Sequence, residues 1–486
     1  MRRVLSSPLV ALAVGLCLRL SFVLRFPANS GDAVLYEQFA TNWLKHHIYA
    51  MDVNGVITPV NMRMPGYPAF LAIIYAITGH TGVDARKWVL LSQILVDLAG
   101  CLVIAALAAA LAFFVYGKAS PRRALKAALW LAVLCPFTAN YTAVPLTEVF
   151  ACLFSGLALF FFCLLLLRLR GTTIYINELS LYLNQRPQVV AALAGIAVGF
   201  GTLFRPETPL LLISCWLALA IYLIRQHQLP ELIRIVLSSG LACGLVLAPW
   251  TIRNAITLHE FQPLAPKNSN LPSEMVARGF MAWEKTWLYR VSDFYLVSWK
   301  LNDEAIELEQ IPARAFDSPE EKQRVANILE TYNDEITLTP EEDAAFAQLA
   351  RERTSRHPLR TYFILPAARA FTIWFTPRIE LIPVSGHVFP LREAWEDDKL
   401  DQSVTIGFFL LNILLIGLAI WGTRRLWNWD SAARPAVVLL LVFILLRTAF
   451  LTTIETPEPR YVLVCFPALI ALAAQLFARR KATLAR

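Results

Sequence analysis

The chain has 486 residues and a formal net charge of +8, and 57% of its residues are hydrophobic while only 16% are charged. A soluble protein carries roughly a quarter charged residues, so this composition excludes an ordinary soluble globular protein. The apolar residues gather in runs close to the ~20 residues that cross a bilayer. The sequence therefore predicts a polytopic membrane protein. Its basic residues cluster in short loops between the runs, which indicates membrane orientation and not a nucleic-acid partner.

About ten apolar runs predict an all-α fold. We expect an N-terminal transmembrane module at 1–253, which contains a first outer loop at 26–86, then an extracytoplasmic loop region with amphipathic helices at 254–402, and C-terminal transmembrane helices at 403–486. The predicted spans lie at about 8–25, 88–116, 124–139, 146–167, 189–204, 209–224, 235–250, 403–421, 436–452 and 461–478.

The two polar regions contain helix signals of their own. In the first outer loop an amphipathic segment runs from Ala33 to Ile48, and the apolar stretch Ala69–Thr78 is short for a crossing, so we expect an interfacial helix there. In the long region, capping boxes at 318–321 and 339–342 predict helices at about 319–333 and 340–354. The apolar segment from Leu359 to Phe375 is predicted to be interfacial, because an eleventh span would break the charge bias.

An even number of spans puts both termini on one side of the membrane. The basic clusters fall on that side, which predicts cytoplasmic termini. Every candidate functional residue falls on the opposite side, and we favour a bacterial inner membrane with the site facing the periplasm over an endoplasmic reticulum membrane. The basic clusters lie at 2–3, 118–126, 168–186, 225–234, 424–434 and 479–486.

The cysteines and histidines do not predict a metal site. All eight cysteines lie within or at the ends of apolar runs, so we interpret them as small buried hydrophobic residues and not as a disulfide framework. The seven histidines are scattered, and no spacing matches a zinc motif.

The first acid of the outer face is Asp32, which follows a Ser-Gly pair at the start of the amphipathic segment. It shares a helical face with Tyr36, Phe39 and Trp43. Two structural interpretations remain open, namely that Asp32 only caps the helix and that the aromatic face only anchors it at the interface. Arg63 stands before a Pro-Gly turn, where it could also be a snorkelling arginine beside lipid headgroups.

Further charged residues of the outer face stand at the boundaries of predicted spans. Glu148 and Glu207 each begin a span, where an acid is also an ordinary partner for the helix dipole. Four arginines, however, lie on the side where positive charge is disfavoured, and arginine offers a planar fork that matches phosphate oxygens. They predict an anionic ligand at the outer face, and they are Arg63, Arg205, Arg253 and Arg460.

Taken together, these short motifs resemble the GT-C glycosyltransferases, most closely the branch with the protein O-mannosyltransferases and the lipid A aminoarabinose transferases. The resemblance covers spans 1 to 7 and the last outer loop, but not about 255–400. The residues that carry it are Asp32, Tyr36, Ala40 and Asn42, the run from Arg63 through Tyr67 to Leu71, Thr147-Glu148, the run Phe204–Glu207, the run Pro249–Asn254 and the run from Glu458 through Arg460 to Tyr461.

The resemblance implies a hexosyl- or pentosyltransferase that takes a sugar from a polyprenyl-phosphate donor. Asp32 would be the general base for an acceptor hydroxyl of a glycolipid, glycan or protein, and the product would be inverted. Arg63, Arg253 and Arg460 are the arginines we expect at the phosphate. No second acid stands beside Asp32, so we expect no metal and no other cofactor. The other residues expected to bind substrate are Tyr36, Tyr67, Glu148, Arg205, Glu207 and Tyr461.

Two other functions would also gather arginines at a membrane surface. A transporter or flippase of lipid-linked sugars usually carries charges near the middle of its spans, and Asp97 is the main acid of that kind here. A polymerase or ligase of lipid-linked glycans is closer, since it would share the topology and the use of arginine.

Overall fold

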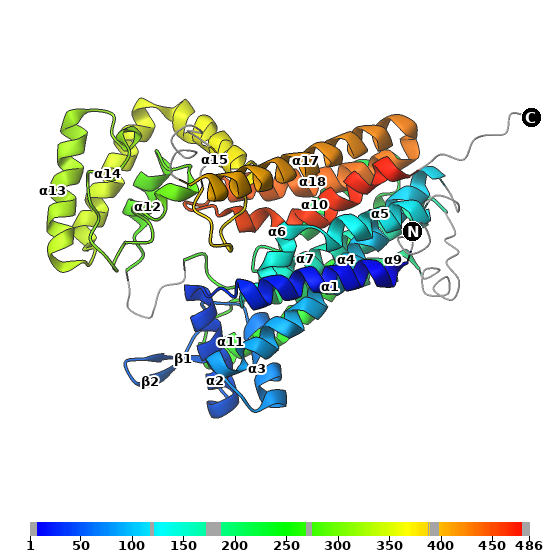
Figure 1. The fold of residues 1–486 in the computed structure, drawn as a ribbon, viewed down its shortest axis with the longest axis horizontal. Coiled ribbons are helices and arrows are strands. Elements are labelled where there is room, and N and C mark those ends of the chain that lie inside the picture. The colour runs from blue at the N-terminus through cyan, green and yellow to red at the C-terminus, as the bar shows by residue number, and fades with distance from the viewer. Residues whose placement is uncertain are drawn as a thin grey trace, which may run out of the picture. The chain divides into compact units, whose positions relative to one another are not determined.

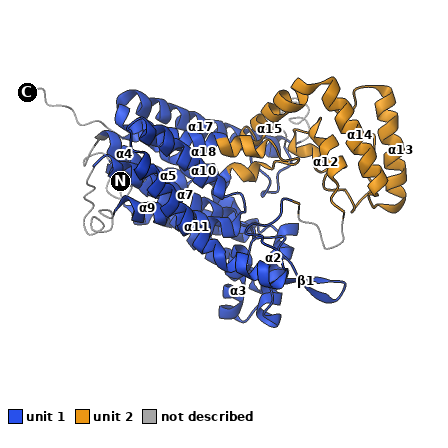
Figure 2. Ribbon diagram, turned by 180° about the vertical axis from the view of Figure 1, so that it is seen from behind, with its two compact units in different colours: residues 1–267, 377–445, 463–486 blue, residues 268–376, 446–462 orange. Residues whose placement is uncertain are grey.

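The computed structural model describes residues 7–116, 121–171, 186–268, 275–386, 388 and 398–478. The chain divides into two compact units (Figure 2). Unit 1 comprises residues 1–267, 377–445 and 463–486, and unit 2 comprises residues 268–376 and 446–462. The basic positions predicted at 2–3, 118 and 479–486 lie outside the described residues.

The all-α prediction is confirmed, with long apolar helices in the order that the sequence predicts (Figure 1). Among the described residues, eight helices are long and apolar enough to cross a membrane. Helices of unit 1 that match predicted spans are α1 (Pro8–Arg25), α4 (Arg86–Tyr116), α7 (Glu148–Leu169), α9 (Pro187–Phe204), α11 (Leu229–Thr257) and α17 (Lys399–Trp429). α18 (Arg434–Leu451) continues into unit 2, and α19 (Phe466–Ala473) has a 3-10 turn at each end, Pro459–Cys465 and Ala474–Phe477.

Two of the ten predicted spans have a less regular form. The third is a pair of segments, Pro121–Val133 and Pro136–Ala143, which meet at a 52° bend and would make a ninth span if they cross together. The bend falls where Pro136 removes a backbone donor and restricts the residue before it. The sixth is α10 (Pro209–Ile224), with only 16 residues. The count of about ten therefore stays a prediction.

A buried ion pair connects three of these helices. Arg19 Nε donates to Asp97 Oδ2 at 2.7 Å, and Arg19 Nη1 donates to the carbonyl oxygens of Gly15 and Val133 at 3.1 and 2.5 Å. The Arg19 side chain is fully buried. Charges in such a place are tolerated only when they are paired and hydrogen-bonded. The sequence showed both residues as isolated interruptions of apolar runs, and the structure joins them.

The first outer loop contains the one departure from the all-α prediction that the described residues show. After α2 (Gly31–His46), strands β1 (Ala50–Val53) and β2 (Val56–Pro59) form an antiparallel hairpin. Asn54 and Gly55 have φ values of 53° and 82°, and Asp52 Oδ1 accepts from Gly55 N at 2.7 Å. An Asn-Gly pair favours this type of turn, so the signal was present in the sequence. The interfacial stretch forms α3 (Gly66–Thr78).

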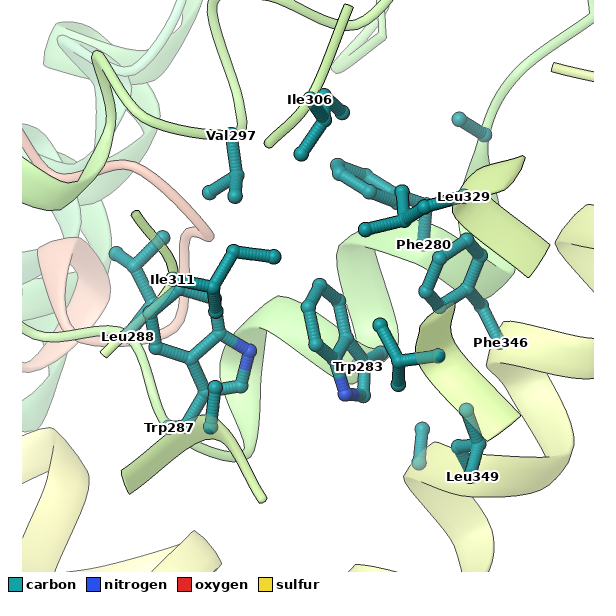
Figure 3. Packing of buried hydrophobic residues seen from close by; sticks show 14 of the residues in the cluster. Phe280, Trp283, Trp287, Leu288, Val297, Ile306, Ile311, Leu329, Phe346 and Leu349 are labelled. Carbon is teal, nitrogen blue, oxygen red and sulfur yellow. The ribbon is translucent and has the colours of Figure 1, made fainter. Parts of the chain in front are cut away.

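Unit 2 packs α12 (Arg278–Lys285), α13 (Pro319–Glu335) and α14 (Pro340–Arg356) around buried aromatic side chains (Figure 3). Trp283 and Phe346 lie with ring centroids 5.0 Å apart. The two helices predicted from capping boxes are present, and Thr339 forms both halves of its box with Glu342. Ser318 accepts from Glu321 N at 3.2 Å, but the Glu321 carboxylate binds Arg353 and Arg356 instead of completing a box.

The apolar segment predicted as interfacial is a π-helix, Arg360–Ile364, followed by α15 (Leu365–Trp374). Pro366 cannot donate a backbone hydrogen bond, which explains the irregular turn before it. The segment is not among the helices long enough to span, and Tyr362 and Phe363 are exposed. Its position at a membrane interface stays a prediction.

A buried carboxyl makes the stability of unit 2 depend on pH. Burial raises the pKa of Glu284 to about 8, and Glu455 adds to the rise while the hydrogen bond from Ser298 and the charge of Arg369 oppose it. An unfolded glutamate titrates near ~4.3. Between about pH 4.3 and 8 the folded protein therefore holds a proton that the unfolded chain has lost. The free energy of unfolding should fall as pH rises through this window.

We predict that Glu284→Gln removes this pH dependence, which amounts to on the order of a few kcal/mol across the window. Unfolding of the full chain between pH 5 and 8.5, followed by intrinsic tryptophan fluorescence, to which Trp283 and Trp287 in the core of unit 2 contribute, measures it. Glu304→Gln, at an exposed position of the same unit, should keep the wild-type slope. A Glu284→Gln protein with the wild-type slope would contradict the prediction.

Candidate functional site

Asp32 lies in the first turn of α2, but it does not cap the helix. The Ser30 side chain is the cap, because its Oγ accepts from Ala33 N at 3.3 Å. The Asp32 carboxylate instead accepts a hydrogen bond from Arg63, with 2.9 Å between Arg63 Nη2 and Asp32 Oδ1. The two side chains are 27% and 28% exposed. The first acid and the first arginine of the outer loop therefore form a solvent-accessible ion pair.

The Pro-Gly turn after Arg63 has a steric reason. A Cβ atom on Gly66 would lie 2.5 Å from the carbonyl oxygen of Leu203, so only glycine allows this contact between backbones. Leu203 is close to the end of α9, and Arg205 follows that helix directly. The contact brings the chain at Arg63 close to the chain at Arg205.

Arg205 holds two acids that come from different segments. Its Nη1 donates to Glu148 Oε1 at 3.0 Å, and its Nε donates to Glu207 Oε1 at 2.8 Å. Glu148 is the first residue of α7 and is almost fully buried. A guanidinium shared by two carboxylates fixes the end of α9 against the start of α7.

Aromatic side chains connect the two charged groups. The rings of Tyr36 and Tyr67 meet edge to face at 5.1 Å, and Phe150 stacks on Phe204 at 4.4 Å. Tyr67 also contacts Phe150, at 6.0 Å between centroids. Tyr67 Oη donates to Gln93 Oε1 at 2.6 Å, which ties α3 to α4. Rigid helices thereby hold the residues at the site.

The Tyr36 hydroxyl lies within the electrostatic influence of both charged groups. Burial raises the pKa of Tyr36 well above its usual range, the charges of Asp32 and Glu148 raise it further, and Arg63 and Arg205 lower it. The hydroxyl therefore stays protonated at neutral pH and remains able to donate a hydrogen bond. Charges of both ion-paired groups therefore act on one phenol.

The sequence predicts Arg253 at the phosphate, and in the structure this arginine contacts backbone carbonyl groups and an aromatic ring. Its Nη2 donates to Tyr49 O at 2.6 Å and its Nη1 donates to Val60 O at 2.8 Å, so it holds the two ends of the hairpin. It also lies over the Trp250 ring, 5.2 Å from the centroid. Figure 1 shows α2, α3 and the hairpin together at one end of α11. The predicted contact of Arg253 with phosphate stays a prediction.

Arg460 and Tyr461 belong to unit 2. Both bind the same oxygen, since Arg460 Nη2 and Tyr461 Oη donate to Glu458 Oε1 at 2.9 and 2.7 Å. Their predicted contribution to the site of Asp32 stays a prediction. In unit 1 the structure brings together Asp32, Tyr36, Arg63, Tyr67, Glu148, Arg205 and Glu207.

Three supporting residues were not found from the sequence. Gln93 is a fully buried polar residue that also donates to Val144 O at 2.9 Å, and its only signal was an amide inside an apolar run. Tyr49 donates to Arg63 O at 3.0 Å, and Ser30 supplies the cap.

In the part of the chain that the structure describes, no group of three His, Cys, Asp or Glu side chains is arranged to hold a metal ion.

No protein-family model and no curated protein matches this chain. Among solved structures, it is similar to the oligosaccharyltransferase AglB from Archaeoglobus fulgidus, solved with an inhibitory peptide and a dolichol-phosphate, at 13% identity and a TM-score of 0.48. That match covers 96% of this chain, which spans only about half (50%) of the length of AglB. It is also similar to ArnT from Cupriavidus metallidurans bound to undecaprenyl phosphate, at 12% identity and a TM-score of 0.39, with 96% of this chain and 77% of ArnT covered.

Because the TM-scores are below 0.5 and the identities are low, the function proposed below rests on the residues of this chain alone.

The contact at Gly66 gives a direct test of how the site is assembled. We predict that Gly66→Ala lowers the free energy of unfolding by about 1–3 kcal/mol, because the new Cβ must push α3 away from the end of α9. Gly31→Ala is the matched control, since a Cβ there meets no heavy atom of the described residues within 4 Å. Thermal unfolding of the purified variants in detergent checks this. Equal melting temperatures for the two variants would contradict it.

Proposed function

We propose that this chain transfers a sugar from a polyprenyl-phosphate donor to an acceptor hydroxyl, with inversion at the anomeric carbon. The observation that carries the proposal is the ion pair between Asp32 and Arg63. It places a carboxylate that can take a proton beside a guanidinium that can bind phosphate. Both side chains are more than a quarter exposed, so a ligand can reach them.

The leaving group of this reaction is a lipid phosphate. A phosphate needs no general acid, because its developing charge only has to be matched by preorganised cations. Arg63 is the arginine of unit 1 that combines exposure with a position beside the acid. The protonated Tyr36 hydroxyl is a further donor at the same place.

The nucleophile is the acceptor hydroxyl. As its oxygen attacks the anomeric carbon from the face opposite the phosphate, Asp32 takes the hydroxyl proton. The new carbon–oxygen bond forms while the bond to the phosphate oxygen breaks, and the electron pair leaves with the phosphate. A positioned base of this kind contributes roughly 10²–10⁴-fold to the rate.

The ion pair also suggests an order of binding. In the free enzyme Arg63 occupies the carboxylate that the acceptor needs. A donor phosphate competes for the same guanidinium and thereby releases Asp32 for the acceptor proton. The donor would therefore bind before the acceptor becomes reactive.

The other site residues have positioning roles in this proposal. Glu148 and Glu207 hold Arg205, which fixes the end of α9 beside the Arg63 turn. Tyr67 holds α3 against α4 through Gln93, and Arg253 holds the hairpin. Arg460 and Tyr461 are proposed to bind substrate from unit 2.

The cellular setting of the proposal rests on the Lys/Arg bias of the loops. The site would face the periplasm from a bacterial inner membrane, with both termini in the cytoplasm. A flippase is less favoured, because Asp97, the acid in the middle of its span, is buried and bound to Arg19 and cannot serve a transport path without breaking that pair.

We predict that Asp32→Asn reduces sugar transfer by at least about 100-fold, because the amide cannot take the proton. Complementation of cells that lack this protein provides the assay, with mass spectrometry of the polyprenyl-phosphate sugar that accumulates. Asp84→Asn, at an exposed position of the same loop, should restore wild-type levels. An Asp32→Asn protein that is stably expressed and fully active would refute the assignment of the base.

A further inference from the structure

The last turns of α17 carry basic and aromatic side chains on one face. Trp421, Arg424, Arg425, Asn428 and Trp429 line an open hollow of about 330 Å³. Their spacing of three and four residues places them on the same side of the helix. The last turns of α17 lie at the end of unit 1 where α1 begins, away from α2 and the hairpin (Figure 1).

Contacts with the C-terminal segment fix this face in place. A Cβ on Gly422 would lie 2.0 Å from Leu472 O, so α17 and α19 approach each other as closely as backbones can. Arg425 Nη1 and Nη2 donate to Leu476 O and Ala478 O at 2.5 and 3.1 Å, and its guanidinium lies 3.8 Å from the centroid of the Trp429 ring. The hollow is thus built on a rigid helix pair.

The Arg424 guanidinium is exposed and can meet a ligand at the hollow. Arg425 lies beside it with its Nε buried, so Arg425 contributes its positive charge and not a direct hydrogen bond from that atom. Of the described residues, two with guanidinium groups and none with a carboxylate line the hollow, and the nearby Asp430 accepts from Ala432 N at 2.9 Å. The chemistry that matches is a phosphate group with a net negative charge.

An apolar strip leads from the hollow toward the middle of the helix on the same face. Leu410, Leu414 and Trp421 are 58%, 55% and 64% exposed. Between them, a Cβ on Gly417 would meet no heavy atom of the described residues within 4 Å, so the surface of the strip is open there. Only 22% of the span window of α17 is buried, which leaves this face to the lipid tails.

We propose that the hollow binds an anionic glycerophospholipid. Its phosphate lies against the exposed Arg424 guanidinium, beside the charge of Arg425. Trp421 and Trp429 flank the headgroup, and one acyl chain follows the open helix surface at Gly417. Arginines at the cytoplasmic end of a membrane helix attract such headgroups, and tryptophan favours the interface. The Lys/Arg bias predicts that this end of α17 is cytoplasmic. A bound lipid would connect α17 to the C-terminal segment, far from the site of sugar transfer.

The test titrates the purified full-length protein in detergent with phosphatidylglycerol or with phosphatidylcholine, and counts bound lipid by native mass spectrometry. We expect phosphatidylglycerol to bind more tightly, and Arg424→Gln to weaken it about fivefold. Gly417→Leu should weaken it as well, because the larger side chain occupies the open surface on which the acyl chain lies. Arg225→Gln is the matched control, since Arg225 is an exposed arginine at the end of another helix with the same predicted sidedness.

Each other outcome overturns the proposal. Equal binding of the two lipids would show that the charge of the lipid does not matter. An equal loss of phosphatidylglycerol binding in Arg225→Gln would show unspecific attraction to arginine. Loss of lipid binding in Gly417→Leu but not in Arg424→Gln would contradict the phosphate contact. Wild-type binding in both of these variants would show that the lipid does not bind at the hollow. Tighter binding of undecaprenyl phosphate than of phosphatidylglycerol would assign the hollow to a different lipid. Melting temperatures without added lipid verify that each variant is folded.

Discussion

The close approach of the backbone at Gly66 to the carbonyl oxygen of Leu203 is the contact on which the candidate site depends. It joins two turns that are far apart in the sequence, one that carries Arg63 and one that carries Arg205. The ion pairs of these arginines with Asp32 and Glu148 then act on the same hydroxyl, that of Tyr36. Without the glycine, α3 could not approach the end of α9 so closely, and the turn that carries Arg63 would lie farther from the turn that carries Arg205.

The charged residues differ in how deeply they are buried and in whether their partners within the protein can be replaced by a ligand. Arg19 and Asp97 are buried together, and Arg205 is divided between two carboxylates, so these arginines serve mainly to hold helices in place. Arg253 is equally occupied by the carbonyl groups of the hairpin. Arg63 is the exception among the predicted site arginines of unit 1, because its partner Asp32 is accessible and a phosphate can replace it. Arg63, which we propose to act in the reaction, therefore differs in burial from the arginines that we assign to positioning.

Much of this could be predicted from the sequence, because apolar runs and the Lys/Arg bias determine the helices of a membrane protein. Most of the site residues predicted in unit 1 also lie close together in the structure. The long-range pairs could not be predicted, since nothing local to Arg19 points to Asp97, or local to Gly66 points to Leu203. The hairpin could have been predicted from Asn54-Gly55, and it explains why Arg253 holds backbone carbonyls. The capping box at Ser318 failed because Glu321 finds stronger partners in two arginines.

The central claim is that a lipid phosphate takes Arg63 away from Asp32. A structure of this protein determined by cryo-electron microscopy with bound polyprenyl phosphate tests it most directly. Our account predicts that the phosphate lies within hydrogen-bonding distance of the Arg63 guanidinium, that the Asp32–Arg63 pair is broken, and that the Asp32 carboxylate faces the space beside the phosphate. A phosphate bound elsewhere, with the 2.9 Å pair between Arg63 and Asp32 intact, would contradict it.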